Sequence, residues 1–85
     1  MNKKTNDEME FDRNFYVKAL YYKELKEYET AIFFFKIALN ELDDKEIIAE
    51  MAEVYQEMAN TFKEIDSDKA LNYLAESKYY RKMIN

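Results

Sequence analysis

Apolar residues recur every three or four positions along most of this chain, which is the spacing of residues on one face of an α-helix. One such stripe covers residues 11–25 and a second covers residues 28–42, with only Lys26 and Glu27 between them. Because a connection this short makes neighbouring helices run antiparallel, we expect residues 7–42 to form a helical hairpin.

A second hairpin is predicted for residues 43–84. Its apolar stripes cover residues 47–65 and 70–80, again at helical spacing. Residues 1–6 carry no such pattern, so we expect them to form a flexible N-terminal tail. Residues 7–85 are then predicted to form one domain of four helices, since a chain of 85 residues leaves no room for a second core.

Acidic residues mark the predicted starts of the third and fourth helices. Asp43 and Glu46 have the spacing of a capping box, with a carboxylate in both positions. Asp66 opens a second polar run, which can end one helix and cap the next. We therefore expect the third helix to begin after Asp43 and the fourth to begin after Asp66.

The composition favours helices throughout the chain. Glycine and proline, the residues that normally supply turns and strand ends, are both absent. Hydrophobic residues make up 48% of the chain and charged residues 36%, which suits helices with one buried and one solvated face. The predicted fold class is all-α, with two antiparallel helical hairpins.

The chain also has no cysteine and no histidine. Disulfides, the usual zinc sites and the commonest general base are therefore excluded together. Glu50, Glu53 and Glu57 lie at helical spacing, but di-iron bundles combine such glutamates with histidines. We expect these glutamates to form a solvated face, and we expect no catalytic residue, no metal site and no cofactor.

The distribution of charge narrows the class of partner. The formal net charge is −5 and the basic residues form no cluster, whereas nucleic acids and anionic membranes attract clustered Lys and Arg. No apolar run is long enough to cross a membrane or to serve as the core of a signal peptide. We expect a cytoplasmic protein that binds neither nucleic acid nor membrane.

Residues 15–39, FYVKALYYKELKEYETAIFFFKIAL, resemble a tetratricopeptide repeat, a helical hairpin of about 34 residues that stacks into solenoids. Ala19 and Ala31 stand at its small crossing positions, and Lys26 and Glu27 stand where the family usually has a glycine or asparagine turn. The other matching positions are Phe15, Tyr22, Leu25, Tyr28, Ile32, Phe35, Ala38 and Leu39. We expect Ala31 and Ala38 to be buried where two helices cross closely.

A weaker second copy covers residues 55–77, with Ser77 in place of the usual alanine. The resemblance implies two repeats in a right-handed stack and the function of a scaffold, which binds a peptide or helix of a partner protein. In this family, the outward residues of the first helix of each repeat line the partner-binding groove. Those residues are Arg13, Tyr16, Val17, Leu20, Lys23, Gln56, Asn60 and Lys63.

Two other interpretations stay open. Residues 7–65 also resemble an MIT domain, a three-helix bundle that docks helical tails, and that reading leaves the fourth helix surplus. A structural homodimer is the third possibility, because Phe33, Phe34 and Phe35 are consecutive and helical residues point about 100° apart. The association face predicted for a homo-oligomer or a partner consists of Phe33, Phe34, Ile37 and Tyr79.

Overall fold

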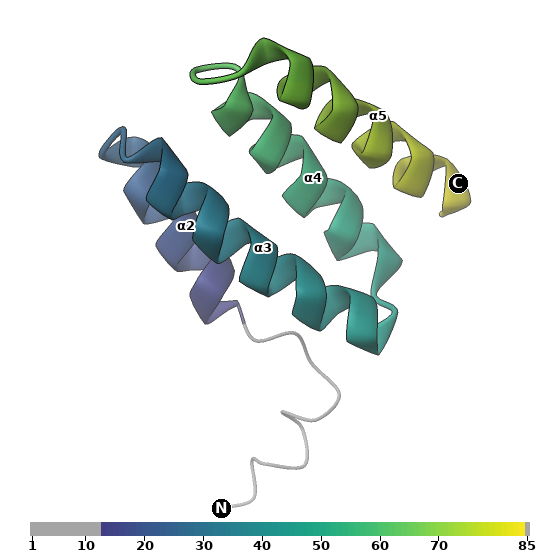
Figure 1. The fold of residues 1–85 in the computed structure, drawn as a ribbon. Coiled ribbons are helices and arrows are strands. Elements are labelled where there is room, and N and C mark those ends of the chain that lie inside the picture. Colours follow the sequence, from purple (N-terminus) through teal and green to yellow (C-terminus); the bar gives the residue numbers. More distant parts are fainter. Residues whose placement is uncertain (1–12, 85) are drawn as a thin grey trace, which may run out of the picture.

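Four helices and no strand make up the part of the chain that the structure, a computed structural model, describes, residues 13–84 (Figure 1). The all-α prediction is confirmed for this part of the chain. The helices are α2 (Asn14–Glu24), α3 (Tyr28–Lys45), α4 (Ile48–Phe62) and α5 (Ser67–Met83). The predicted tail and the predicted start of the first helix lie outside the described residues.

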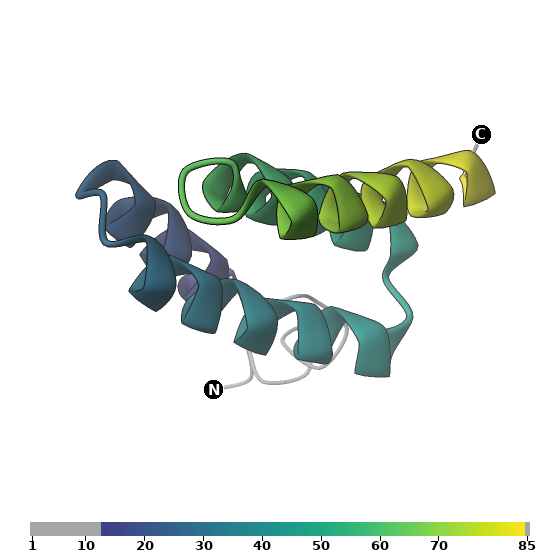
Figure 2. The ribbon, with the colours of Figure 1, turned by 45° about the horizontal axis from the view of Figure 1, so that its top comes forward.

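The four helices pack as two hairpins that meet through α4. Helix α2 packs on α3, helix α4 packs on α5, and α4 also contacts α3. Consecutive helices run in opposite directions, and the hairpin of α4 and α5 lies beside the hairpin of α2 and α3 (Figures 1 and 2). Helices α3 and α4 each pack on two neighbours, so the two hairpins meet where α3 contacts α4.

Two turns without glycine close α2 and α3. Lys26 and Glu46 have positive φ angles of 65° and 57°, a conformation that costs an ordinary residue about 1–2 kcal/mol. In the first turn, the N–H groups of Lys26 and Glu27 donate to the carbonyls of Lys23 and Tyr22 at 2.9 Å, which is the Schellman pattern. The second turn repeats the pattern, with bonds from Glu46 to Asp43 and from Ile47 to Leu42.

Of the two predicted helix caps, the one at Asp43 is not formed and the one at Asp66 is confirmed. Asp43 lies inside α3, which continues to Lys45, and the residue before α4 is Ile47, whose side chain makes no capping bond. The prediction that Asp43 and Glu46 cap the third helix is wrong, because α3 continues through Asp43 to Lys45 and Glu46 is the left-handed residue of the Schellman turn that ends it. The Asp66 carboxylate does cap α5, where it accepts from the N–H of Lys69 at 3.2 Å.

Small residues lie at the centre of the core. Ala19, Ala31 and Ala38 are fully buried, and they allow helix backbones to approach closely. Phe35 and Leu42 fill the space beside them and are fully buried as well. The predicted burial of Ala31 and Ala38 is confirmed.

Among the described residues, three apolar residues of the predicted stripes are exposed. Leu25, Ile65 and Leu71 expose 50%, 44% and 66% of their surface. Leu25 and Ile65 lie just past the ends of α2 and α4, where the chain turns away from the packed helices. Leu71 lies on α5, which packs mainly on α4, so a side chain on another side of α5 stays in solvent.

The two hairpins repeat one packing arrangement. In the first, the ring of Phe34 stacks on Phe15 and Tyr22, with centroid distances of 6.2 and 5.6 Å. In the second, the ring of Tyr73 stacks on Tyr55 and Phe62 at 6.0 and 5.0 Å. Small buried residues correspond in the same way: Ala19 to Ala59, Ala31 to Ala70, and Ala38 to Ser77. These pairs give a residue-by-residue correspondence between the hairpins.

Candidate functional site

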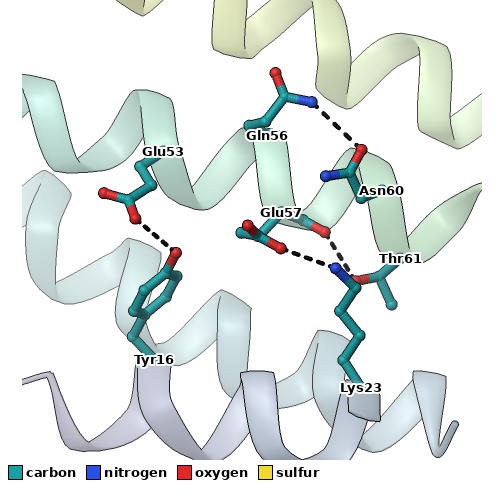
Figure 3. Close-up of polar contacts among 7 residues, drawn as sticks. All are labelled: Tyr16, Lys23, Glu53, Gln56, Glu57, Asn60 and Thr61. Atoms are coloured by element: carbon teal, nitrogen blue, oxygen red, sulfur yellow. Dashed lines mark hydrogen bonds and ion pairs between the residues drawn. The ribbon is translucent and has the colours of Figure 1, made fainter.

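Polar side chains join α2 to α4 along the predicted groove. All three bonds run from a residue of the α2 segment to a glutamate of α4, and two of them appear in Figure 3. The pairs are Arg13 with Glu50, Tyr16 with Glu53 at 2.9 Å, and Lys23 with Glu57 at 2.9 Å. Three of the eight predicted groove residues therefore hold the two hairpins together.

Tyr16 is the most enclosed of these groove residues. Its surface is 5% exposed, and its ring packs against Phe35 at a centroid distance of 5.9 Å. Burial, and then the hydrogen bond to Glu53, raise the pKa of the Tyr16 phenol well above its ordinary value. Because the ring is in the core and the hydroxyl is already bonded, Tyr16 stabilises the fold and has little surface left for a ligand.

The other predicted groove residues differ in exposure. Val17 is 57% exposed and Lys63 is exposed, whereas Leu20, Gln56 and Asn60 are half-buried. The Gln56 amide donates to Asn60 within α4 at 3.4 Å (Figure 3). One cavity of about 430 Å³ brings together groove and turn residues, namely Lys23, Glu24, Lys26, Tyr28, Asn60, Lys63 and Glu64. Its charges are mixed, so the cavity selects no ion of one sign.

The glutamates of α4 keep part of their surface in solvent, and they also bond to α2. Glu50, Glu53 and Glu57 accept bonds from α2 across the seam between the hairpins. Sequence spacing gives their common helix face, but it cannot show which residues of α2 lie opposite. Within residues 13–84, no group of three acidic side chains is arranged to hold a metal ion.

Exposed aromatic and apolar side chains of the first hairpin form a second surface, which we call the outer face. It is formed by α2 and α3, and its largest exposed side chains are Tyr21 at 60%, Phe33 at 59% and Leu25 at 50%. Edge contacts between rings make it continuous, since Tyr21 meets Tyr22 at 5.3 Å and Phe33 meets Phe34 at 5.3 Å. The outer face consists of Lys18, Tyr21, Tyr22, Leu25, Phe33, Phe34 and Ile37, with Val17 at its rim.

The predicted association face is divided between the two hairpins. Phe33, Phe34 and Ile37 belong to the outer face, where Phe34 and Ile37 are half-buried. Tyr79 lies on α5 and is 59% exposed. The sequence could not place Tyr79, because the side of α5 that faces α4 follows from the crossing of the two helices.

Part of the outer face, on α2, corresponds to buried residues of α4, whereas the equivalents of Leu25, Phe33 and Ile37 are exposed; these are Ile65, Asn72 and Glu76. The stacked rings align Phe15 and Tyr22 of α2 with Tyr55 and Phe62 of α4. In this alignment, Tyr21 is equivalent to Thr61 and Lys18 is equivalent to Met58. Thr61 and Met58 are fully buried, in the helix that packs against α3. Tyr21 is 60% exposed and Lys18 is exposed. These two positions are therefore open on α2, whereas their equivalents on α4 are covered.

Comparison of this chain with family models, with curated proteins and with solved structures finds no match. None of the helices in the described part of the chain has the length and apolar character needed to cross a membrane.

Proposed function

We propose that this chain is a protein-interaction module that binds a helix of a partner protein on the outer face of its first hairpin. The observation that carries the proposal is the pairing of exposed Tyr21 with buried Thr61. In the second hairpin, α3 packs on the helix that holds Thr61, whereas Tyr21 and Lys18 of the first hairpin are open to solvent.

The apolar content of the outer face supports the proposal. Tyr21, Leu25 and Phe33 each expose half or more of their surface, and Val17 at the rim exposes 57%. Burying one such side chain fully contributes about 1.5–3 kcal/mol. A group of exposed aromatic residues on one face is typical of a protein-binding surface. Binding without catalysis also fits a chain that has no histidine and no cysteine.

The proposed occupant is a helix because a helix, α3, packs on the part of α4 that holds the equivalents of Lys18 and Tyr21. Helix α3 presents Ile32, Phe35, Leu39 and Leu42, spaced by three and four positions, and all four are buried or half-buried. A partner helix with apolar residues at this spacing can pack on Lys18 and Tyr21 of α2 as α3 packs on α4.

We further propose that the chain consists of two tetratricopeptide-like repeats in a right-handed stack. The support comes from the matched ring stacks around Phe34 and Tyr73, since each repeat places one ring of its second helix between two rings of its first. An MIT-like bundle needs three helices, and it gives no role to the packing of α5 on α4. We therefore prefer the two-repeat hypothesis.

Selection from a library of helical peptides displayed on phage tests the proposed function. We expect bound peptides with apolar residues at positions i, i+3 or i+4, and i+7. Tyr21→Glu should weaken their binding at least about tenfold, which corresponds to about 1.4 kcal/mol. Tyr79→Glu is the matched control, because Tyr79 has the same side chain and nearly the same exposure, 59% against 60%. An equal effect of both variants, or an effect of Tyr79→Glu alone, overturns the proposal.

The homodimer hypothesis is tested in the same preparation by light scattering. We expect a monomer of 10.4 kDa over the whole concentration series. A stable dimer that Phe33→Ser converts to monomer would show that a second copy occupies the outer face, and it would overturn the proposal of a separate partner.

A further inference from the structure

One cation lies among the aromatic side chains of the outer face. The Nζ atom of Lys18 is 5.8 Å from the ring centroid of Phe15 and 5.7 Å from that of Phe34. An ammonium at this distance is attracted by the negative faces of the rings. Its equivalent in the second hairpin is Met58, which is fully buried. The exposed position on α2 therefore carries the charged Lys18, whereas the equivalent buried position on α4 carries the uncharged Met58.

This charge restricts what can cover the outer face. A helix that packs there as α3 packs on α4 removes water from the Lys18 ammonium, and an unpaired buried charge is strongly unfavourable. A carboxylate opposite Lys18 would restore the lost interaction as a charge-assisted hydrogen bond, which is strong where water is excluded. The rings of Phe15 and Phe34 already hold the ammonium near the middle of the face.

Building on the proposed function, we propose that the partner helix carries an aspartate or glutamate within its apolar stripe, facing Lys18. The partner is then an amphipathic helix with an acidic residue on its apolar side. Such a residue is uncommon on the buried side of a helix, so Lys18 also selects against ordinary apolar helices.

The positive charge of Lys18 also disfavours a second copy of this chain as the occupant. The positions of α5 that correspond to Leu39 and Leu42 of α3 are Lys78 and Arg81. A copy that stacked as α3 stacks on α4 would bring two cations to the face that holds Lys18. Like charges at a desolvated contact repel strongly, so the occupant we propose is a different protein.

Exchange of charges between the chain and a selected peptide tests this inference. The probe is a helical peptide from the phage selection, made with glutamate, glutamine or lysine at its acidic stripe position. For the unmodified chain, glutamate→glutamine in the peptide should weaken binding at least about tenfold. Lys18→Met, which copies the equivalent residue Met58, should remove that difference, and Lys18→Glu should favour the lysine peptide. Circular dichroism of both variants controls for folding, since Lys18 is exposed.

Two results would overturn the inference and leave the proposed function intact. Selected peptides without any acidic residue, whose binding still depends on Tyr21, would show that the Lys18 side chain turns outward to water. An equal loss from glutamate→glutamine in the unmodified chain and in Lys18→Met would show that the acid contacts another residue. Loss of dependence on Tyr21 would instead refute the proposed function itself.

Discussion

The hydroxyl of Ser77 donates a hydrogen bond of 2.8 Å to the backbone carbonyl of Ala52. This bond joins α5 to α4 at a point where both residues are buried, with exposures of 0% and 2%. Ser77 corresponds to Ala38 of the first hairpin, which is also fully buried. The two positions need a small side chain, and serine adds a bond between the helices that alanine cannot make.

Replacing Ser77 separates the role of its size from that of its hydroxyl. Ser77→Ala should lower the free energy of unfolding by about 0.5–1.5 kcal/mol, because one buried hydrogen bond is lost. Ser77→Leu should lower it by a further 1–3 kcal/mol or so, because the added carbons overpack the crossing. Urea denaturation measures both. Equal stability of the two variants would contradict the close crossing of α4 and α5.

The first hairpin permits the same test at Ala31. Ala31→Leu should destabilise the fold by about 1–3 kcal/mol, since Ala31 is fully buried at the crossing of α2 and α3. Ala49→Leu is the matched control, because Ala49 is exposed on α4 and should change stability by less than about 0.5 kcal/mol. Equal melting temperatures for Ala31→Leu and the unmodified chain would refute the packing described here.

The helical stripes of the sequence predict most of the core but not the seam between the hairpins. Ala19, Ala31 and Phe35 follow helical periodicity, and all three are fully buried. Tyr16 lies off the apolar stripe and is nevertheless 5% exposed, because α4 covers it from the side and Glu53 bonds its hydroxyl. Periodicity within one helix carries no information about which residue of another helix lies opposite.

The seam bond between Lys23 and Glu57 should contribute little to stability. Both side chains are partly exposed, 30% and 26%, and the ion pair is 2.9 Å long, so water and salt screen it. A double-mutant cycle with Lys23→Met and Glu57→Gln should give a coupling below about 1 kcal/mol that shrinks as salt is added. A coupling of several kcal/mol that salt does not change would contradict this view of the seam.

Stability should fall at alkaline pH because tyrosines of the hairpins resist ionisation. Burial, followed by the neighbouring Tyr80 and Glu76, raises the pKa of Tyr55 to about 12. The unfolded chain, with tyrosine pKa values near 10, then binds fewer protons than the folded chain above pH 10. The contribution of Tyr55 to the free energy of unfolding is therefore fully present below about pH 10 and is lost as pH rises towards 12. Tyr55→Phe should make urea stability decline less steeply in that window, and an unchanged slope would contradict the burial of the phenol.

The two turns with left-handed residues could be predicted from the sequence only in part. The repeat resemblance implies a glycine or asparagine turn at Lys26 and Glu27, and in the structure it is Lys26 that adopts the left-handed conformation, with a φ angle of 65°. Glu46 has the same geometry, yet its sequence context favours a helix start. Acidic residues suit a helix N-terminus and also occur inside helices, so Asp43 and Glu46 did not reveal that α3 continues.

Cysteine labelling of the chain with and without a selected helical peptide tests most directly which face binds the partner. The chain has no cysteine, so single variants report one position each. Leu25→Cys and Phe33→Cys lie on the outer face, and Gln56→Cys and Lys63→Cys lie on the side of α4 assigned to the groove. We predict that peptide slows labelling at positions 25 and 33 at least about tenfold, as burial at an interface requires, and leaves positions 56 and 63 unchanged. Protection of positions 56 and 63, with 25 and 33 labelled as fast as in the free chain, would contradict the account.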